Sequence, residues 1–167
     1  MIELLQKLIQ IPSENNGVTG YEKEVQSFYY QWLKERGIPV KWIEPDKIPD
    51  FDRHPARLLE HCMHNRPLVV AQLQGKKPGK NRLLLAHADT VPVGKLSDWQ
   101  DSPFSGKREN GRIYGRGSGD DKWGMAVMAG VALEAKKRLW DFPGCVTIAS
   151  VPDEESGGGN GTAALLA

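Results

Sequence analysis

Two near-continuous apolar runs are the feature that most constrains how this chain can fold. They cover Leu68–Leu73 and Arg82–His87, and a third strand-like run covers Cys145–Val151. Strands that read as unbroken apolar segments are buried on both faces of their sheet. The turn-rich residues 75–81 separate the first two runs, which predicts that these two strands are neighbours. The runs therefore predict a sheet that is covered on both faces.

Helical spacing of apolar residues alternates with these strands. It predicts helices over residues 2–10, from about residue 21 to Gly37, from the pair Asp120–Asp121 to about Arg138, and from Gly161 onward. Thr19 and Glu22 have the spacing of a capping box at the second helix. Helices that alternate with buried strands indicate an α/β fold with helices on both faces of the sheet.

The composition excludes several classes of protein. The chain has 167 residues, 40% hydrophobic and 26% charged, as in an ordinary globular protein. A net charge of +1 gives no electrostatic attraction to nucleic acid or to an anionic membrane. The N-terminus lacks the layout of a signal peptide, and Cys62 and Cys145 are too few for a disulfide framework. We therefore expect a cytoplasmic protein without nucleic-acid or membrane partners.

His87 and Asp89 stand two residues apart at the end of a predicted strand, so their side chains point to the same side. A metal-bound imidazole usually donates its other N–H to a carboxylate, a role that suits Asp89. Taken alone, such a pair is more often a surface histidine beside a turn aspartate. Asp120 follows three alternate glycines, where the backbone turns sharply, and could bridge two cations or simply cap a helix.

Glu154 and Glu155 directly follow the third strand. Adjacent side chains diverge, so one carboxylate can bind a metal while the other takes a proton from water. An isolated acidic pair is usually a solvated turn. The three motifs together are more informative, because each lies at or just past the C-terminal end of a predicted strand, where α/β sheets place their sites.

Two rival sites have weaker support. The glycines around Asp120 suggest a phosphate loop, but neither the P-loop nor the dinucleotide-binding spacing occurs in the chain. The segment His61–His64 contains residue types that bind metals, and His54 lies nearby, but this irregular region is far from the three motifs in sequence. We interpret it as a polar surface turn.

At these motifs the chain resembles the co-catalytic zinc metallopeptidase family, which includes acetylornithine deacetylase, succinyl-diaminopimelate desuccinylase, aminoacylase and carboxypeptidase G. AHADTVPVG is similar to the family's first metal motif, GRGSGDDKWGMA to its second, and PDEESGGGNGT to its third. Looser similarity extends to WQDSPF and NGRIYGRG, so nearly the whole chain is covered. Trp123 departs from the pattern, because the family often has glycine there.

The resemblance implies a role for each residue. His87 would bind one zinc, Glu155 would bind the other, and Asp120 would bridge both, with a cis peptide bond to Asp121. Glu154 would be the general base, and Asp89 would orient His87. Two zinc ions are the implied cofactors, with cobalt or manganese as alternatives, since histidine and carboxylate ligands suit several metals.

The implied activity is hydrolysis of an amide or peptide bond in a small N-acyl amino acid or peptide. The fold would be the N-terminal portion of a zinc-exopeptidase-like catalytic domain, with residues 1–167 forming a partial domain. The family's further acidic ligand, distant histidine, and smaller lid or dimerisation domain are absent after Thr162. We therefore expect this fragment to be inactive alone and the complete protein to be a homodimer. The alternative is a non-catalytic remnant that binds a metal or another protein.

Overall fold

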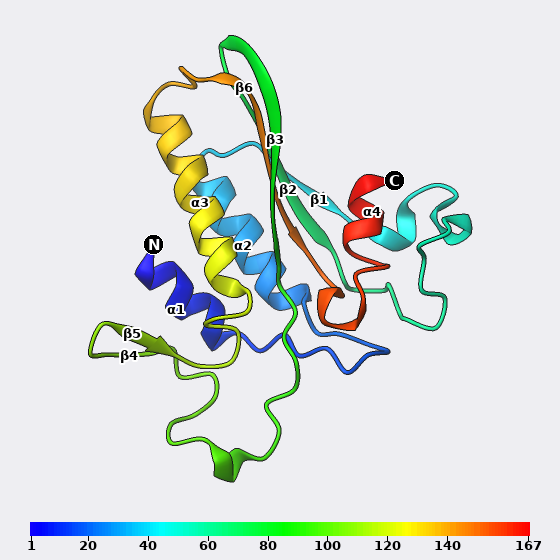
Figure 1. Cartoon of the computed structure of the whole chain (residues 1–167), viewed down its shortest axis with the longest axis vertical. Coiled ribbons are helices and arrows are strands. Elements are labelled where there is room, and N and C mark those ends of the chain that lie inside the picture. Colours follow the sequence, from blue (N-terminus) through cyan, green and yellow to red (C-terminus); the bar gives the residue numbers. More distant parts are fainter.

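The computed structural model describes residues 1–167, which form a four-stranded sheet, a small hairpin and four α-helices (Figure 1). The strands of the sheet are β1 (Val40–Ile43), β2 (Leu68–Gln74), β3 (Lys77–His87) and β6 (Pro143–Val151). The hairpin pairs β4 (Lys107–Glu109) with β5 (Arg112–Tyr114). The α-helices are α1 (Ile2–Gln10), α2 (Lys23–Glu35), α3 (Lys122–Lys137) and α4 (Thr162–Leu166).

The strand order in the sheet is β1-β2-β6-β3, so the prediction that the runs at 68–73 and 82–87 are neighbours was wrong. β6 lies between them, antiparallel to β2 and parallel to β3. The physical reason is the crossover connection through α3. It brings the chain back parallel to β3 and places β6 between β2 and β3. Gly75 and Gly144 allow the strand ends to meet closely, because a Cβ at either position would lie 2.1 Å from a backbone oxygen.

The two faces of the sheet are covered unequally (Figure 1). α1, α2 and α3 pack on one face, where the larger core gathers apolar side chains such as Leu8, Leu33, Met125 and Ile148. On the other face a smaller cluster includes Phe51, Leu68, Val151 and Ala164, from the 45–53 turns, the sheet and α4. The predicted α/β class with helices on both faces is confirmed.

The start of α2 differs from the prediction. The helix begins at Lys23, and no side chain caps its N-terminus, so the capping box of Thr19 and Glu22 was wrong. Glu22 is fully buried and pairs with Arg66 instead, because a carboxylate that faces the interior needs a cationic partner. None of the helices combines the length and the apolar character needed to cross a membrane.

Candidate metal centre

The three predicted metal ligands lie around one point at the edge of the sheet. His87 ends β3, Asp120 lies in the loop before α3, and Glu155 lies in the turn after β6. β3 and β6 are parallel neighbours, with His87 opposite Val151, so their C-terminal ends share this edge. One ligand atom from each of the three residues lies within 4.8 Å of the others. This grouping provides one imidazole and two carboxylates.

His87 is 5% exposed and has acidic groups on both sides. Its Nε2 lies 2.9 Å from Asp120 Oδ1, and its Nδ1 lies 3.0 Å from the backbone oxygen of Asp89. The Asp89 carboxylate is more distant, at 3.5 Å from Nδ1. Burial by itself lowers the pKa of His87, but the Asp89 and Asp120 carboxylates outweigh burial and raise the pKa to about 10.

Asp89 is fully buried and links the first motif to the third. Its Oδ2 accepts hydrogen bonds from Asn15 Nδ2 at 2.8 Å and from the Glu155 backbone N–H at 3.0 Å. Its Oδ1 accepts a bond from the Glu154 N–H at 3.2 Å. Burial raises the pKa of Asp89, but the interactions with His87, Asn15 and the Glu155 backbone outweigh it, so the net pKa is lowered. Asp89 therefore remains an anion that fixes the backbone of the third motif.

The side chains of Glu154 and Glu155 both reach the centre from the turn after β6. Glu154 Oε2 lies 3.5 Å from His87 Nε2, and its side chain is 49% exposed. Glu155 accepts a hydrogen bond from the Val91 backbone N–H at 3.3 Å. Burial is the largest influence on Glu155 and raises its pKa. The half-exposed Glu154 thus faces both the histidine and solvent.

The second motif is attached to α1 by a lysine that sequence reasoning missed. The Asp120–Asp121 peptide bond is cis, as the resemblance implied, and Asp121 makes no side-chain cap to α3. The next residue, Lys122, is fully buried and donates to the backbone oxygens of Leu8 at 2.9 Å and Ile11 at 2.7 Å. Lys122 thereby gives the Ile11 oxygen a partner at the C-terminal end of α1, and adds a second bond to the Leu8 oxygen, which already accepts the Ile11 N–H.

Further buried polar residues near the centre also escaped prediction. Arg66 pairs with Glu22 and with Asp153, the residue before Glu154. His61 Nδ1 lies 3.2 Å from Asp153 Oδ1, whereas His64 Nδ1 lies 3.2 Å from Asp46. The interpretation of this segment as a surface turn was therefore wrong for His61, which is buried, whereas His64 is exposed. Arg66 and Asp153 are 87 positions apart, so no local sequence pattern could reveal their pairing. The only hint of a cationic partner was the run of acidic residues in PDEE.

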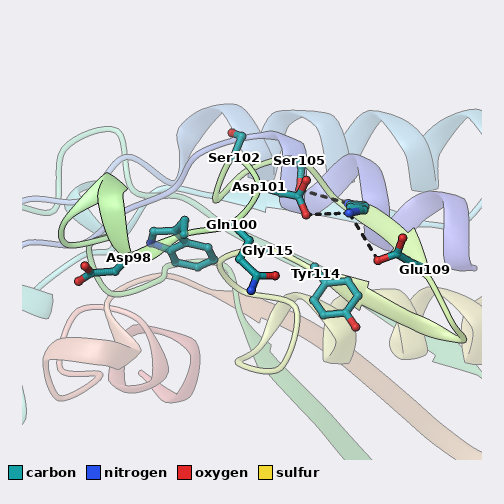
Figure 2. Close-up of a pocket in the computed structure, with 10 residues that line it drawn as sticks. Asp98, Gln100, Asp101, Ser102, Ser105, Glu109, Tyr114 and Gly115 are labelled. Carbon is teal, nitrogen blue, oxygen red and sulfur yellow. Dashed lines mark hydrogen bonds and ion pairs between the residues drawn. The ribbon is translucent and has the colours of Figure 1, made fainter.

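A separate surface pocket of about 240 Å³ lies beside the β4–β5 hairpin (Figure 2). Lys107 Nζ contacts Asp101 at 3.0 Å and Glu109 at 3.4 Å, and Tyr114 lines the same hollow. Lys107 thus offsets part of the negative charge of Asp101 and Glu109. None of the candidate metal ligands lines this pocket.

Comparison with known proteins shows the family of the chain. Residues 83–167, which hold all three motifs, match the profile of Peptidase family M20/M25/M40. A succinyl-diaminopimelate desuccinylase of Methylorubrum populi is 41% identical over 168 residues, which are 99% of this chain and 38% of the relative. The chain thus spans well under half the length of this curated relative.

Solved structures show the same fold. Human carnosine dipeptidase 1 aligns with a TM-score of 0.72 at 16% identity, over 94% of this chain and 32% of that one. The YXEP protein of Bacillus subtilis, described as a dinuclear metal-binding peptidase of the M20 family, aligns with a TM-score of 0.63 at 21% identity, over 99% and 37%. With its sequence match and its fold, this chain belongs to Peptidase family M20/M25/M40.

Proposed function

We propose that the chain is part of a metal-dependent hydrolase that cleaves an amide or peptide bond. The observation that carries the proposal is the grouping of His87, Asp120 and Glu155 within 4.8 Å, with Glu154 beside them. One imidazole and two carboxylates are ligands that suit zinc, and also cobalt or manganese. The metal-binding M20 peptidase of Bacillus subtilis has the same fold, which supports a cation at this place.

The residues present fit two zinc ions that share one ligand. His87 and Asp120 would hold one ion, and Asp120 and Glu155 the other. Asp120 suits the bridging role because its side chain is 75% exposed and its Oδ1 already lies 2.9 Å from His87 Nε2. When bound, such a pair of cations lowers the pKa of a shared water and stabilises negative charge on an amide oxygen.

Glu154 is the proposed general base. Its carboxylate is half-exposed, so a substrate and a water can reach it, and its Oε2 lies 3.5 Å from His87 Nε2. At Oε2 it would take a proton from the attacking water and then transfer this proton to the leaving amine. Asp89 accepts hydrogen bonds from the backbone N–H groups of Glu154 and Glu155, which holds the base and the ligand at the same centre.

The proposed substrate is a small N-acyl amino acid or peptide. The support is the desuccinylase relative and the dipeptidase fold neighbour, both of which are named for cleavage of such bonds. A location in the cytoplasm, inactivity of this fragment alone and a homodimer of the complete protein stay predictions.

Calorimetric titration with Zn²⁺ tests the assignment of roles. Glu155→Gln should weaken zinc binding, because an amide is a poorer ligand than a carboxylate. Glu154→Gln should bind zinc like the native chain, yet lower the amide-hydrolysis rate in any preparation that shows turnover. Equal zinc affinity in all three proteins would contradict the proposed ligands, and near-native turnover in Glu154→Gln would contradict the proposed base.

A further inference from the structure

A buried arginine joins two carboxylates behind the candidate metal centre. Arg66 is 1% exposed, and both Glu22 and Asp153 are fully buried. Its Nε and Nη2 donate to Glu22, at 3.0 and 2.6 Å, while its Nη1 donates to Asp153 Oδ1 at 2.9 Å. Buried ion pairs are weak grounds for stability, since desolvation offsets much of the attraction. Stability alone therefore does not account for this arrangement.

Asp153 has a backbone conformation that its contacts must hold. Its φ of 67° is in the left-handed region, which is uncommon for residues other than glycine. Besides Arg66, its carboxylate accepts hydrogen bonds from Ser156 Oγ at 2.9 Å and from the Asn160 backbone N–H at 3.2 Å. His61 Nδ1 lies 3.2 Å from the same group. The Asp153 carboxylate therefore holds the turn after β6 through these hydrogen bonds.

This turn carries both acidic residues of the third motif. Glu154 and Glu155 follow Asp153 directly, and their N–H groups bind Asp89 on the other side. The turn is thus held between two buried carboxylates, Asp89 at the metal centre and Asp153 behind it. Arg66 donates a charge-assisted hydrogen bond to Asp153.

We propose that Arg66 is a positioning residue for the metal centre: through Asp153 it fixes the turn that aims Glu154 and Glu155. The proposal rests on the proposed function, because it assigns these two carboxylates to metal binding and proton transfer. Groups that orient metal ligands typically change metal affinity by about 10–100-fold when they are removed. Arg66 would act in this way without touching metal or substrate.

A merely structural arginine makes a different prediction. If Arg66 only joins the start of α2 to the end of β6, then weakening either of its two ion pairs should have similar consequences. If Arg66 positions the turn, only the pair with Asp153 should affect the metal centre. Glu22→Gln is the matched control, because it leaves the hydrogen bond from Arg66 to Asp153 in place.

The test compares Co²⁺ binding and amide hydrogen exchange in the native chain and three variants. The first is the control Glu22→Gln. The second is Glu22→Gln combined with Arg66→Met, which removes the guanidinium without leaving a charged Glu22 unpaired. The third is Asp153→Asn, which keeps the pair of Arg66 with Glu22 and covers the case in which the double variant fails to fold.

We expect the control to bind Co²⁺ within about twofold of the native chain, and the other two variants to bind at least about tenfold more weakly. The amides of Glu154 and Glu155 should exchange faster in these two variants, whereas the Val70 amide in β2 keeps its protection relative to the control. Native-like Co²⁺ affinity and native-like exchange at both glutamates would overturn the proposal.

The two measurements separate the positioning role from the metal centre itself. If the native chain binds no Co²⁺, or if His87→Ala binds it equally well, the proposed function fails and amide exchange alone decides the role of Arg66. If the native chain binds Co²⁺ through His87, and the Arg66 and Asp153 variants bind it equally well with native-like exchange at both glutamates, the positioning role fails and the metal centre stands.

Discussion

Replacement of Asp89 by alanine should destabilise the metal-free protein strongly. The substitution removes the acceptor of three donors: Asn15 Nδ2 and the backbone N–H groups of Glu154 and Glu155. A buried donor left without a partner costs about 1–3 kcal/mol. Water can reach the two part-buried backbone groups, so we expect about 3–5 kcal/mol in total rather than the full sum. Such a loss is at least about a fifth of the 5–15 kcal/mol stability of a typical domain.

The assay is urea unfolding followed by tryptophan fluorescence, in the presence of a chelator so that metal binding does not contribute. Asp98→Ala is the control, because Asp98 is an exposed aspartate on the loop that follows the same motif. The control should change the free energy of unfolding by no more than about 0.5 kcal/mol. If Asp89→Ala loses less than about 1 kcal/mol, Asp89 does not hold the third motif in place.

Three further predictions concern the centre and the core. Zinc affinity should fall about tenfold for each pH unit below the His87 pKa of about 10, because the ring must lose its proton to bind the metal. A zinc affinity that titration calorimetry finds independent of pH would contradict this. Tyr29→Phe removes a buried 2.8 Å hydrogen bond to a carbonyl of α3, so urea unfolding should show a loss of about 1–2 kcal/mol with unchanged zinc affinity. Gly161→Ala would place Cβ 1.8 Å from Pro152 O, so thermal unfolding should show that the free energy of unfolding falls by about 1–3 kcal/mol. An unchanged unfolding midpoint would count against close packing at Gly161.

The sequence predicted those features that depend on local periodicity. The helix over residues 2–10 matches α1, and the apolar runs match strands, because their patterns reflect which faces are buried. The grouping of His87 with Glu155 could also be foreseen, since both follow strands of one sheet. The position of β6 between β2 and β3 could not be foreseen, because strand order depends on how α3 crosses the sheet.

The buried contacts of Arg66 and Lys122 near the site were not predictable from local sequence patterns. Glu22 fits a capping box in sequence, yet its partner Arg66 lies 44 positions away in a segment that reads as irregular. Lys122 looks like a surface lysine at the start of a helix, yet it is fully buried against the end of α1. In both cases long-range contacts decide the role of a charged residue whose local sequence suggests exposure.

The most direct test of the account is the zinc content of the purified chain at equilibrium with free Zn²⁺, measured by metal analysis beside His87→Ala. The account predicts that the native chain binds zinc and that His87→Ala loses most of it. Zinc binding that is equal in the two proteins, or none in the native chain, would contradict the claim that the three motifs form a metal centre.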